Sequence, residues 1–152
     1  MRGRKAQPWY SDMRARLRFE RGARQRYPDL SVSATGRGRG AEVIYRLTVE
    51  MPQYGTRRIT IRLINGFEPH GSQITADGPT NSPHRFSSDA LCIWHPDDPP
   101  EQKWEGEDGL LELINQAVIH LFKEAYWRET GEWLGPEAPH AVAKDPDNRR
   151  AA

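Results

Sequence analysis

The chain has 152 residues, of which 36% are hydrophobic, and a formal net charge of +1 at pH 7. This length fits one domain that buries a hydrophobic core. The single cysteine excludes an intramolecular disulfide framework and a multi-cysteine zinc site, and it predicts a reducing, cytoplasmic environment. The sequence has neither a signal peptide nor the roughly 20 consecutive apolar residues of a membrane-spanning helix, so we expect a cytoplasmic protein with no membrane contact.

The charges are unevenly distributed along the chain. Nine of the first 26 residues are Lys or Arg, opposed only by Asp12 and Glu20, whereas residues 97–112 carry seven acidic residues and the single base Lys103. Clustered arginines can bind nucleic-acid phosphates. They also attract acidic proteins, and here we expect a protein partner and no nucleic acid.

The first predicted element is a helix over residues 9–27, because apolar residues recur among its arginines at helical spacing. Ser11 or Asp12 can cap the start of this helix, and Pro28 ends it. Residues 33–40 are rich in glycine and are predicted to form a loop.

Two antiparallel strands are predicted next. Residues 43–51 and 57–64 alternate apolar and polar side chains, as half-buried strands do, and residues 52–55 between them have the composition of a turn. Residues 73–76 are predicted to add a short strand. Prolines and glycines break the pattern over residues 66–89, which predicts a long ordered loop of the kind that carries functional residues.

The most strongly patterned element is a helix over residues 109–127, which has eight apolar residues at helical spacing and Asp108 as its predicted cap. The end of the chain is rich in proline, alanine and charge. Residues 141–152 are therefore predicted to be disordered, which leaves a single domain over residues 1–140. A helix, a strand meander, an irregular segment and a closing helix together predict an α+β fold.

Cys92 is the strongest candidate for chemistry. A lone cysteine is most often a small buried hydrophobic residue. Cys92, however, follows a polar stretch at residues 87–89 and precedes His95. A thiolate is both a good nucleophile and a good leaving group, so this position favours a residue that accepts and releases an acyl group. His120 lies in the last predicted helix without a second histidine at metal-ligand spacing, and no metal site is expected.

Taken in order, these residues resemble the ubiquitin-conjugating enzyme family from about residue 9 to residue 133. Residues 66–69 resemble the tyrosine-proline turn of that family, residues 91–93 resemble its isoleucine-cysteine-leucine core, and Trp104 resembles the tryptophan before its next helix. The resemblance implies a ubiquitin-conjugating-like fold with an N-terminal helix, an antiparallel β-meander, an irregular active-site segment and a C-terminal helix.

The core at residues 91–94 and the tail from residue 129 to residue 140 most resemble the stand-alone bacterial conjugating proteins of antiphage CBASS operons. This resemblance implies that Cys92 takes the C-terminal carboxyl group of a protein as a thioester and passes it to an amine. The carried protein would be a cGAS-like nucleotidyltransferase or, alternatively, a ubiquitin-like protein. No cofactor is implied for this chain, because the carboxyl group would be activated elsewhere.

One position departs from the family. The family places histidine-proline-asparagine before the cysteine, with the asparagine eight residues ahead of it, and here Ser82-Pro83-His84 occupies that frame. In the family this asparagine supports the oxyanion of the tetrahedral intermediate, directly or by ordering the loop, and such a donor is worth ~3 kcal/mol. His84 is therefore predicted to join Cys92 as a catalytic residue through its imidazole N–H.

Alternatives remain for both residues. His84 could be an ordinary loop histidine that binds backbone carbonyls, with the oxyanion role absent. The chain could be a conjugating-type binding module that has lost activity and scaffolds a partner protein. It could also be a cysteine hydrolase that uses Cys92 with His84 or His95, although no protease motif flanks the cysteine.

Overall fold

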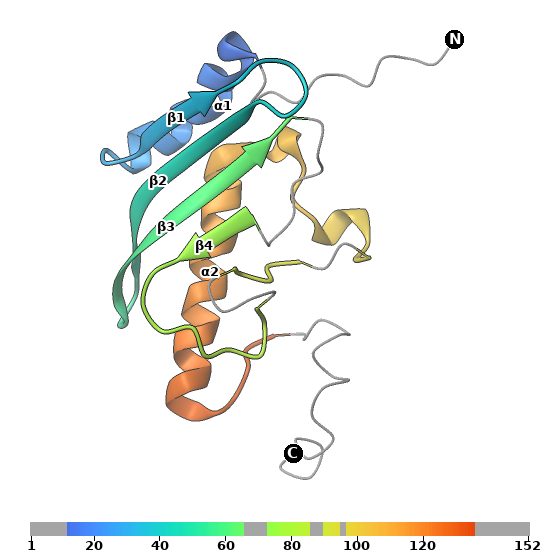
Figure 1. Ribbon diagram of the computed structural model, residues 1–152. Helices are drawn as coiled ribbons and strands as arrows, with labels where there is room; N and C mark the ends of the chain where they lie inside the picture. The colour runs from blue at the N-terminus through green and yellow to red at the C-terminus, as the bar shows by residue number, and fades with distance from the viewer. Residues whose placement is uncertain (1–11, 66–72, 86–89, 95–96, 136–152) are drawn as a thin grey trace.

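A computed structural model describes residues 12–65, 73–85, 90–94 and 97–135 of the chain. It is an α+β structure with an N-terminal helix, a four-stranded antiparallel sheet and a long C-terminal helix, as predicted (Figure 1). The predicted domain boundary at residue 140, the predicted disorder of residues 141–152 and the turn at residues 66–69 lie outside the described residues. Within the described ranges, no helix has the length and apolar character that a membrane span requires.

Helix α1 spans Met13–Arg26, which confirms the predicted helix except that Asp12 and Tyr27 flank it as its caps. Of the two predicted caps, Asp12 is the one observed: its side chain accepts a hydrogen bond from the backbone N–H of Arg14 at 3.1 Å. Ser11 lies outside the described residues. The helix ends because a residue that precedes a proline disfavours helical backbone angles, and Tyr27 before Pro28 adopts φ −124° and ψ 88°.

The sheet has the order β1-β2-β3-β4, with β1 at Ser31–Thr35, β2 at Glu42–Met51, β3 at Gly55–Ile64 and β4 at Ile74–Ala76. The two strands predicted from alternation are confirmed as β2 and β3, and the short strand predicted at residues 73–76 is confirmed as β4. The prediction of a loop over residues 33–40 was wrong at its start, because residues 33–35 belong to β1 and pair with β2. β1 is a mostly exposed edge strand, so its small side chains lack the apolar alternation that would have revealed it.

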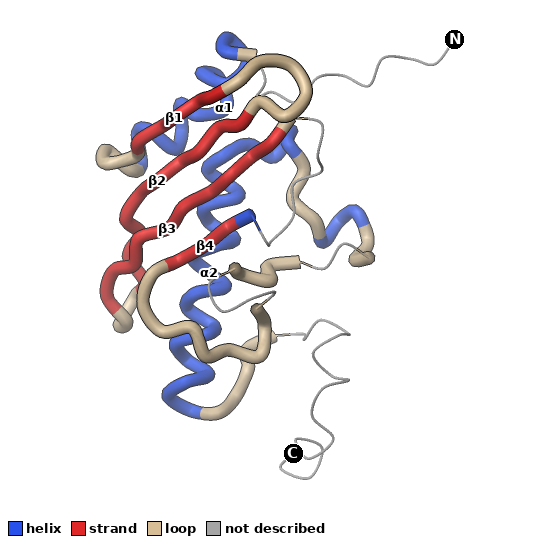
Figure 2. Tube along the Cα trace, viewed as in Figure 1, coloured by secondary structure: helices blue, strands red, loops and turns tan. Residues whose placement is uncertain are grey.

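The hydrophobic core lies between the sheet and the two helices, which cover the same face of the sheet (Figure 2). Alternate residues of β2 and β3 point into this core and are almost fully buried: Val43, Tyr45, Leu47, Val49, Ile59, Ile61 and Leu63. From α2, the core receives Leu110, Leu113, Ile114, Ala117 and Leu121. The opposite face of the sheet carries polar side chains, as expected for an antiparallel sheet with one solvated face.

Helix α2 spans Gly109–Thr130 and so extends three residues beyond its predicted end. Its C-cap Gly131 has φ 77°, a left-handed conformation that favours glycine, and its N–H donates to the carbonyl of Trp127 at 2.7 Å. Asp108 is the N-cap residue of α2, as predicted, but its side chain makes no capping hydrogen bond to this helix. That side chain instead accepts from the backbone N–H of Glu105 at 2.9 Å, in the capping box of the preceding 3₁₀ turn.

A buried carboxylate fastens α1 to the sheet. Glu20 is fully buried and accepts a hydrogen bond from the hydroxyl of Tyr45 on β2 at 2.7 Å. Arg24 donates to the other carboxylate oxygen of Glu20 at 2.9 and 3.1 Å. Nε of Arg16 lies 2.9 Å from the oxygen that Tyr45 contacts. Burial raises the pKa of Tyr45, and the hydrogen bond to Glu20 raises it further. We call Arg16, Glu20, Arg24 and Tyr45 the Glu20 cluster.

Candidate active site

Cys92 lies in a short segment that packs beside the last strand of the sheet. Ala90 forms an isolated antiparallel bridge with Thr75 of β4, and the N–H of Leu91 donates to the carbonyl of Ile74 at 2.9 Å. These contacts hold the segment against the sheet edge. The Cys92 side chain is buried, with 4% of its surface exposed, and its sulfur lies 4.0 Å from the carbonyl oxygen of Trp94.

Cys92 borders a pocket of about 240 Å³. The pocket is lined by Cys92, His84, Ile119, His120, Lys123 and Trp133, among others. The structure therefore brings together the two residues that the sequence predicted to be catalytic. A larger hollow of about 400 Å³ lies on the polar outer face of the sheet around Arg46 and Thr60, but no cysteine or histidine lines it. The smaller pocket is the better candidate site, because Cys92, the predicted nucleophile, lines it.

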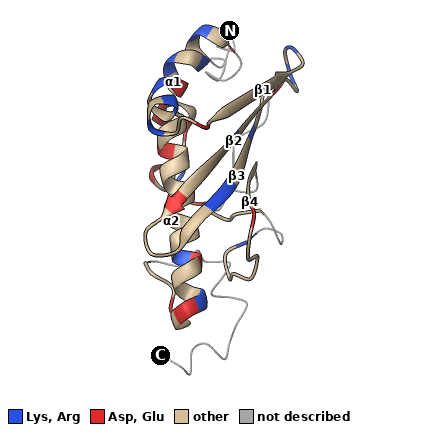
Figure 3. Cartoon of the chain, turned by 90° about the vertical axis from the view of Figure 1, so that its left-hand side faces the viewer, with Lys and Arg blue, Asp and Glu red and all other residues tan. Residues whose placement is uncertain are grey.

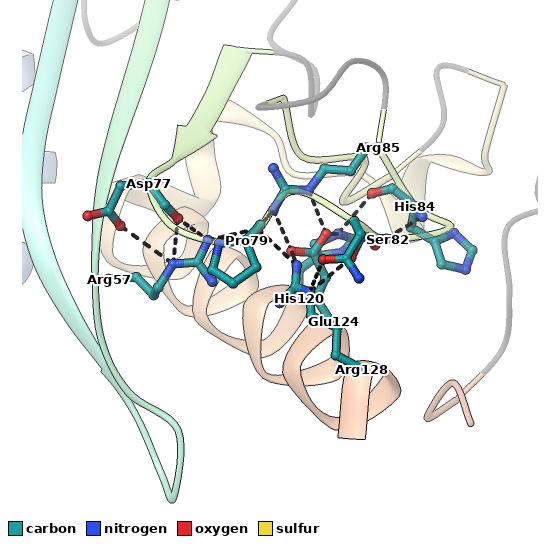
Figure 4. A network of polar contacts seen from close by, with 10 residues as sticks. Arg57, Asp77, Pro79, Ser82, His84, Arg85, His120, Glu124 and Arg128 are labelled. Carbon is teal, nitrogen blue, oxygen red and sulfur yellow. Dashed lines mark hydrogen bonds and ion pairs between the residues drawn. The ribbon is translucent and has the colours of Figure 1, made fainter. Parts of the chain in front are cut away.

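His84 meets Cys92 through its backbone. The carbonyl oxygen of His84 accepts a hydrogen bond from the N–H of Cys92 at 3.2 Å, and it also lies 3.1 Å from Nε2 of His120. The buried imidazole ring of His84 points away from these contacts (Figure 4). It packs on Trp133, with ring centroids 4.1 Å apart. The backbone of His84 is thus anchored on two sides while its ring forms part of the pocket wall.

Beneath this segment lies a buried ionic group that we call the Glu124 cluster, formed by Arg85, His120, Glu124 and Arg128 (Figure 4). Glu124 of α2 is fully buried. Arg85 donates to its two oxygens from Nε and Nη2, both at 2.6 Å, and Arg128 donates to it at 3.3 Å. Two-point pairing of this kind fixes the plane of the guanidinium as well as its position.

Opposing effects act on the pKa of Glu124. Burial raises it, but hydrogen bonds from His120, Arg85 and Ser82 outweigh burial and lower the pKa to about 2. The carboxylate therefore stays ionised near neutral pH. Nε2 of His120 lies close to two acceptors, the His84 carbonyl at 3.1 Å and the Glu124 carboxylate at 3.5 Å, so the hydrogen-bond geometry assigns a proton to Nε2.

Three arginines converge on one backbone carbonyl in the loop that leads to His84. The oxygen of Pro79 accepts from the Nη2 atoms of Arg57, Arg85 and Arg128 at 3.4, 3.3 and 3.0 Å. Arg57 also donates to the carbonyl of Asp77, and burial lowers its pKa. Because these side chains come from β3, the loop itself and α2, the loop is held from three directions.

Sequence reasoning missed the Glu124 cluster. It looked for a second histidine as the partner of His120, whereas the partners are a carboxylate at i+4 and a backbone carbonyl. A usable signal existed, since His120, Glu124 and Arg128 recur every four residues and so lie along one side of the helix. His95 and residues 87–89, which the sequence placed around the thiol, lie outside the described residues. Within the described ranges, no group of three or more His, Cys, Asp or Glu residues could hold a metal ion.

Comparison with known families gives one informative match. Residues 10–141 match a family described as "Type II CBASS E2 protein". Searches of curated proteins and of solved structures return no match. The matched region runs from before α1 to beyond Trp133 and so includes Cys92, the pocket and the Glu124 cluster.

Proposed function

The chain belongs to the family of type II CBASS E2 proteins, and from this premise we propose that Cys92 carries the C-terminus of another protein as a thioester and transfers it to an amine. One observation carries the proposal: the only cysteine of the chain lines a pocket together with His84, the residue in the frame of the family's oxyanion donor. A carrier of this kind needs a nucleophile that is also a good leaving group, and among side chains the thiol best meets both conditions.

The proposed reaction has two acyl transfers. The Cys92 thiolate attacks a C-terminal carbonyl that has already been activated; the S–C bond forms and the activating group leaves. An amine then attacks the thioester carbonyl, the C–N bond forms, the C–S bond breaks, and the amine proton passes to solvent or a base. Each step passes through a tetrahedral oxyanion, for which the His84 imidazole N–H is the proposed donor.

The proposed carried protein is a cGAS-like nucleotidyltransferase, with a ubiquitin-like protein as the alternative. A docking surface for an acidic partner is available on α1, which carries many basic residues (Figure 3). Among them, Arg14, Arg18 and Arg21 are exposed. Met13 and Leu17 on the same helix are 68% and 51% exposed. Met13 and Leu17 lie one helical turn apart and would give this surface a small apolar contact, toward which the arginines would steer an acidic partner.

The test is co-expression of the chain, or of Cys92→Ala, with a candidate nucleotidyltransferase, followed by intact mass and by gels run with and without reductant. The expected product is an adduct whose mass is the sum of the two proteins minus one water. It should be cleaved by hydroxylamine and should be absent from Cys92→Ala. A disulfide would instead weigh two hydrogens less than the sum, and that result would count against acyl transfer.

A catalytically inactive binding module is the second candidate. The observation that favours it is the burial of the thiol, since only 4% of the Cys92 surface is exposed. In this case the two proteins would co-purify without any adduct, and alkylation of Cys92 would leave their association unchanged. These two results together would reject the proposed enzyme and support the binding module.

A further inference from the structure

We infer that Glu124 is a positioning residue for the thiol: through Arg85 and His120 it fixes the backbone of His84, and through that backbone it fixes Cys92. The consequence for acyl transfer rests on the proposed function, whereas the geometry of the thiol can be tested without it. Neither Glu124 nor His120 was expected to have a role from the sequence.

The first link joins α2 to the segment that carries His84. Arg85 and Glu124 are 39 residues apart in the sequence, and both hydrogen bonds between them are 2.6 Å long. Both side chains are nearly or fully removed from solvent, with 4% and 0% exposure. A buried pair with two-point geometry resists rotation and displacement far more than an exposed pair does. Arg85 is therefore held in one orientation relative to α2.

The second link passes through His120, one helical turn before Glu124. Its Nε2 proton is shared between the Glu124 carboxylate at 3.5 Å and the His84 carbonyl at 3.1 Å. The negative charge of Glu124 favours the tautomer that carries a proton on Nε2. Only such a form can donate to His84, so the carboxylate sets the hydrogen bond that anchors the His84 backbone.

The third link transfers this anchoring to the thiol. The His84 carbonyl accepts from the N–H of Cys92 at 3.2 Å, and the neighbouring residues Arg85 and Leu91 form an antiparallel bridge. Residues 84–85 and 91–92 thus lie side by side as a short antiparallel pair. A displacement of one strand must move the other, because the bridge and the hydrogen bond join them at consecutive positions.

Loss of the carboxylate charge should release this chain of contacts. Without the Glu124 charge, Arg85 and Arg128 would be left as largely buried cations with weaker partners, and His120 would lose its preference for a proton on Nε2. The segment would then open more often. The thiol would become more accessible to a small reagent, and its alignment for acyl transfer would become worse.

The chain offers a matched control in the Glu20 cluster. Glu20 is likewise a fully buried helical carboxylate that is paired with two arginines, but it fastens α1 to β2 and contacts no residue of the thiol pocket among those described. Glu20→Gln removes a charge from the same kind of environment. This substitution should lower the free energy of unfolding without changing the alkylation rate of Cys92. It therefore distinguishes a loss of positioning from a general loss of stability.

The experiment compares wild type, Glu124→Gln and Glu20→Gln at a temperature where thermal melts show all three folded. The rate of Cys92 alkylation by iodoacetamide is followed by intact mass across pH 6–9. We expect Glu124→Gln to react about tenfold faster than wild type and Glu20→Gln to stay within about twofold of it. Equal rates for wild type and Glu124→Gln, or equal acceleration in both variants, would overturn the inference.

If Glu124→Gln does not fold, Arg85→Lys serves as the second variant, because lysine keeps the charge but cannot form the two-point pair. It should also accelerate alkylation, and a wild-type rate would reject the positioning role. Where wild type forms the thioester, Glu124→Gln should lower the transfer rate about 10²-fold, the cost of a misplacement of about 1 Å. Failure of wild type to form any thioester would reject the proposed function alone and leave the alkylation result standing.

Discussion

The indole ring of Trp133 packs on the imidazole ring of His84, with centroids 4.1 Å apart and planes at 45°. Trp133 reaches this position because Gly131, in its left-handed conformation, ends α2 and turns the chain back. The same indole lies 5.5 Å from the ring of His120. The residues after α2 therefore complete the wall of the pocket that holds Cys92.

Replacing Trp133 should expose the thiol. Trp133→Ala removes the aromatic wall over His84, so we expect the rate of Cys92 alkylation by iodoacetamide to rise several-fold, with little change in the pH dependence of the reaction. Trp127→Ala is the matched control, because Trp127 is also partly buried near the end of α2 but does not line the pocket. Identical rates in the two variants would show that Trp133 does not limit access to the thiol.

The proposed oxyanion role of His84 predicts a clear order among substitutions. His84→Leu keeps the bulk against Trp133 but has no donor, so the rates of thioester formation and transfer should fall about 10²-fold. His84→Asn restores the amide that the family has at this position and should retain most of the rate. Single-turnover measurements with a pre-activated donor would separate the two variants. If His84→Leu kept the wild-type rate, His84 would only line the pocket and would not donate a hydrogen bond to the oxyanion.

The lowered pKa of Glu124 predicts a stability that depends on pH. The pKa is about 2 in the folded chain and near 4.5 when unfolded, so the stabilisation is fully present above about pH 4.5 and is lost as pH falls toward 2. The stabilisation from the ionised Glu124 is on the order of 3 kcal/mol, which is a large part of the usual free energy of unfolding of a domain. Urea unfolding at pH 7 and pH 3 should show a gap between wild type and Glu124→Gln that shrinks at pH 3. A gap independent of pH would contradict the assignment.

The Glu20 cluster predicts a loss of stability that leaves the site intact. Tyr45→Phe removes the 2.7 Å hydrogen bond to a fully buried carboxylate, and we expect the free energy of unfolding to fall by about 1–3 kcal/mol. Chemical denaturation measures this change. The alkylation rate of Cys92 under native conditions should stay at the wild-type value, and a rise comparable to that of Glu124→Gln would mean that the two clusters are coupled.

The fold was more predictable from the sequence than the site was. Alternation revealed β2 and β3, and helical spacing revealed α2, because burial of one face dictates those patterns. β1 was not predicted, because Ser33 and Thr35 are exposed on an edge strand that pairs only with β2 and therefore lack an apolar pattern. In the site, the family frame associated His84 with Cys92, and the two residues line one pocket. The Arg85–Glu124 pair, by contrast, joins residues 39 positions apart and depends on how α2 packs.

A last prediction concerns Gly78 in the loop held by three arginines. Gly78 has φ +82°, and a Cβ added there would lie 2.8 Å from Nε of the buried Arg57. Arg57 cannot move aside freely, because it donates to the carbonyls of Asp77 and Pro79. Gly40 is the matched control, since its φ is +87° but no atom lies within 4 Å of an added Cβ.

Both Gly78→Ala and Gly40→Ala should therefore lose about 1–2 kcal/mol from the strained backbone conformation. Gly78→Ala should lose more, because the added methyl group also displaces Arg57 from its carbonyl partners and leaves part of a buried guanidinium unsatisfied. Urea unfolding of the two variants measures the difference between them. Equal losses would mean that the Arg57 contacts adjust without cost, and the arginines would then not be what holds this loop in place.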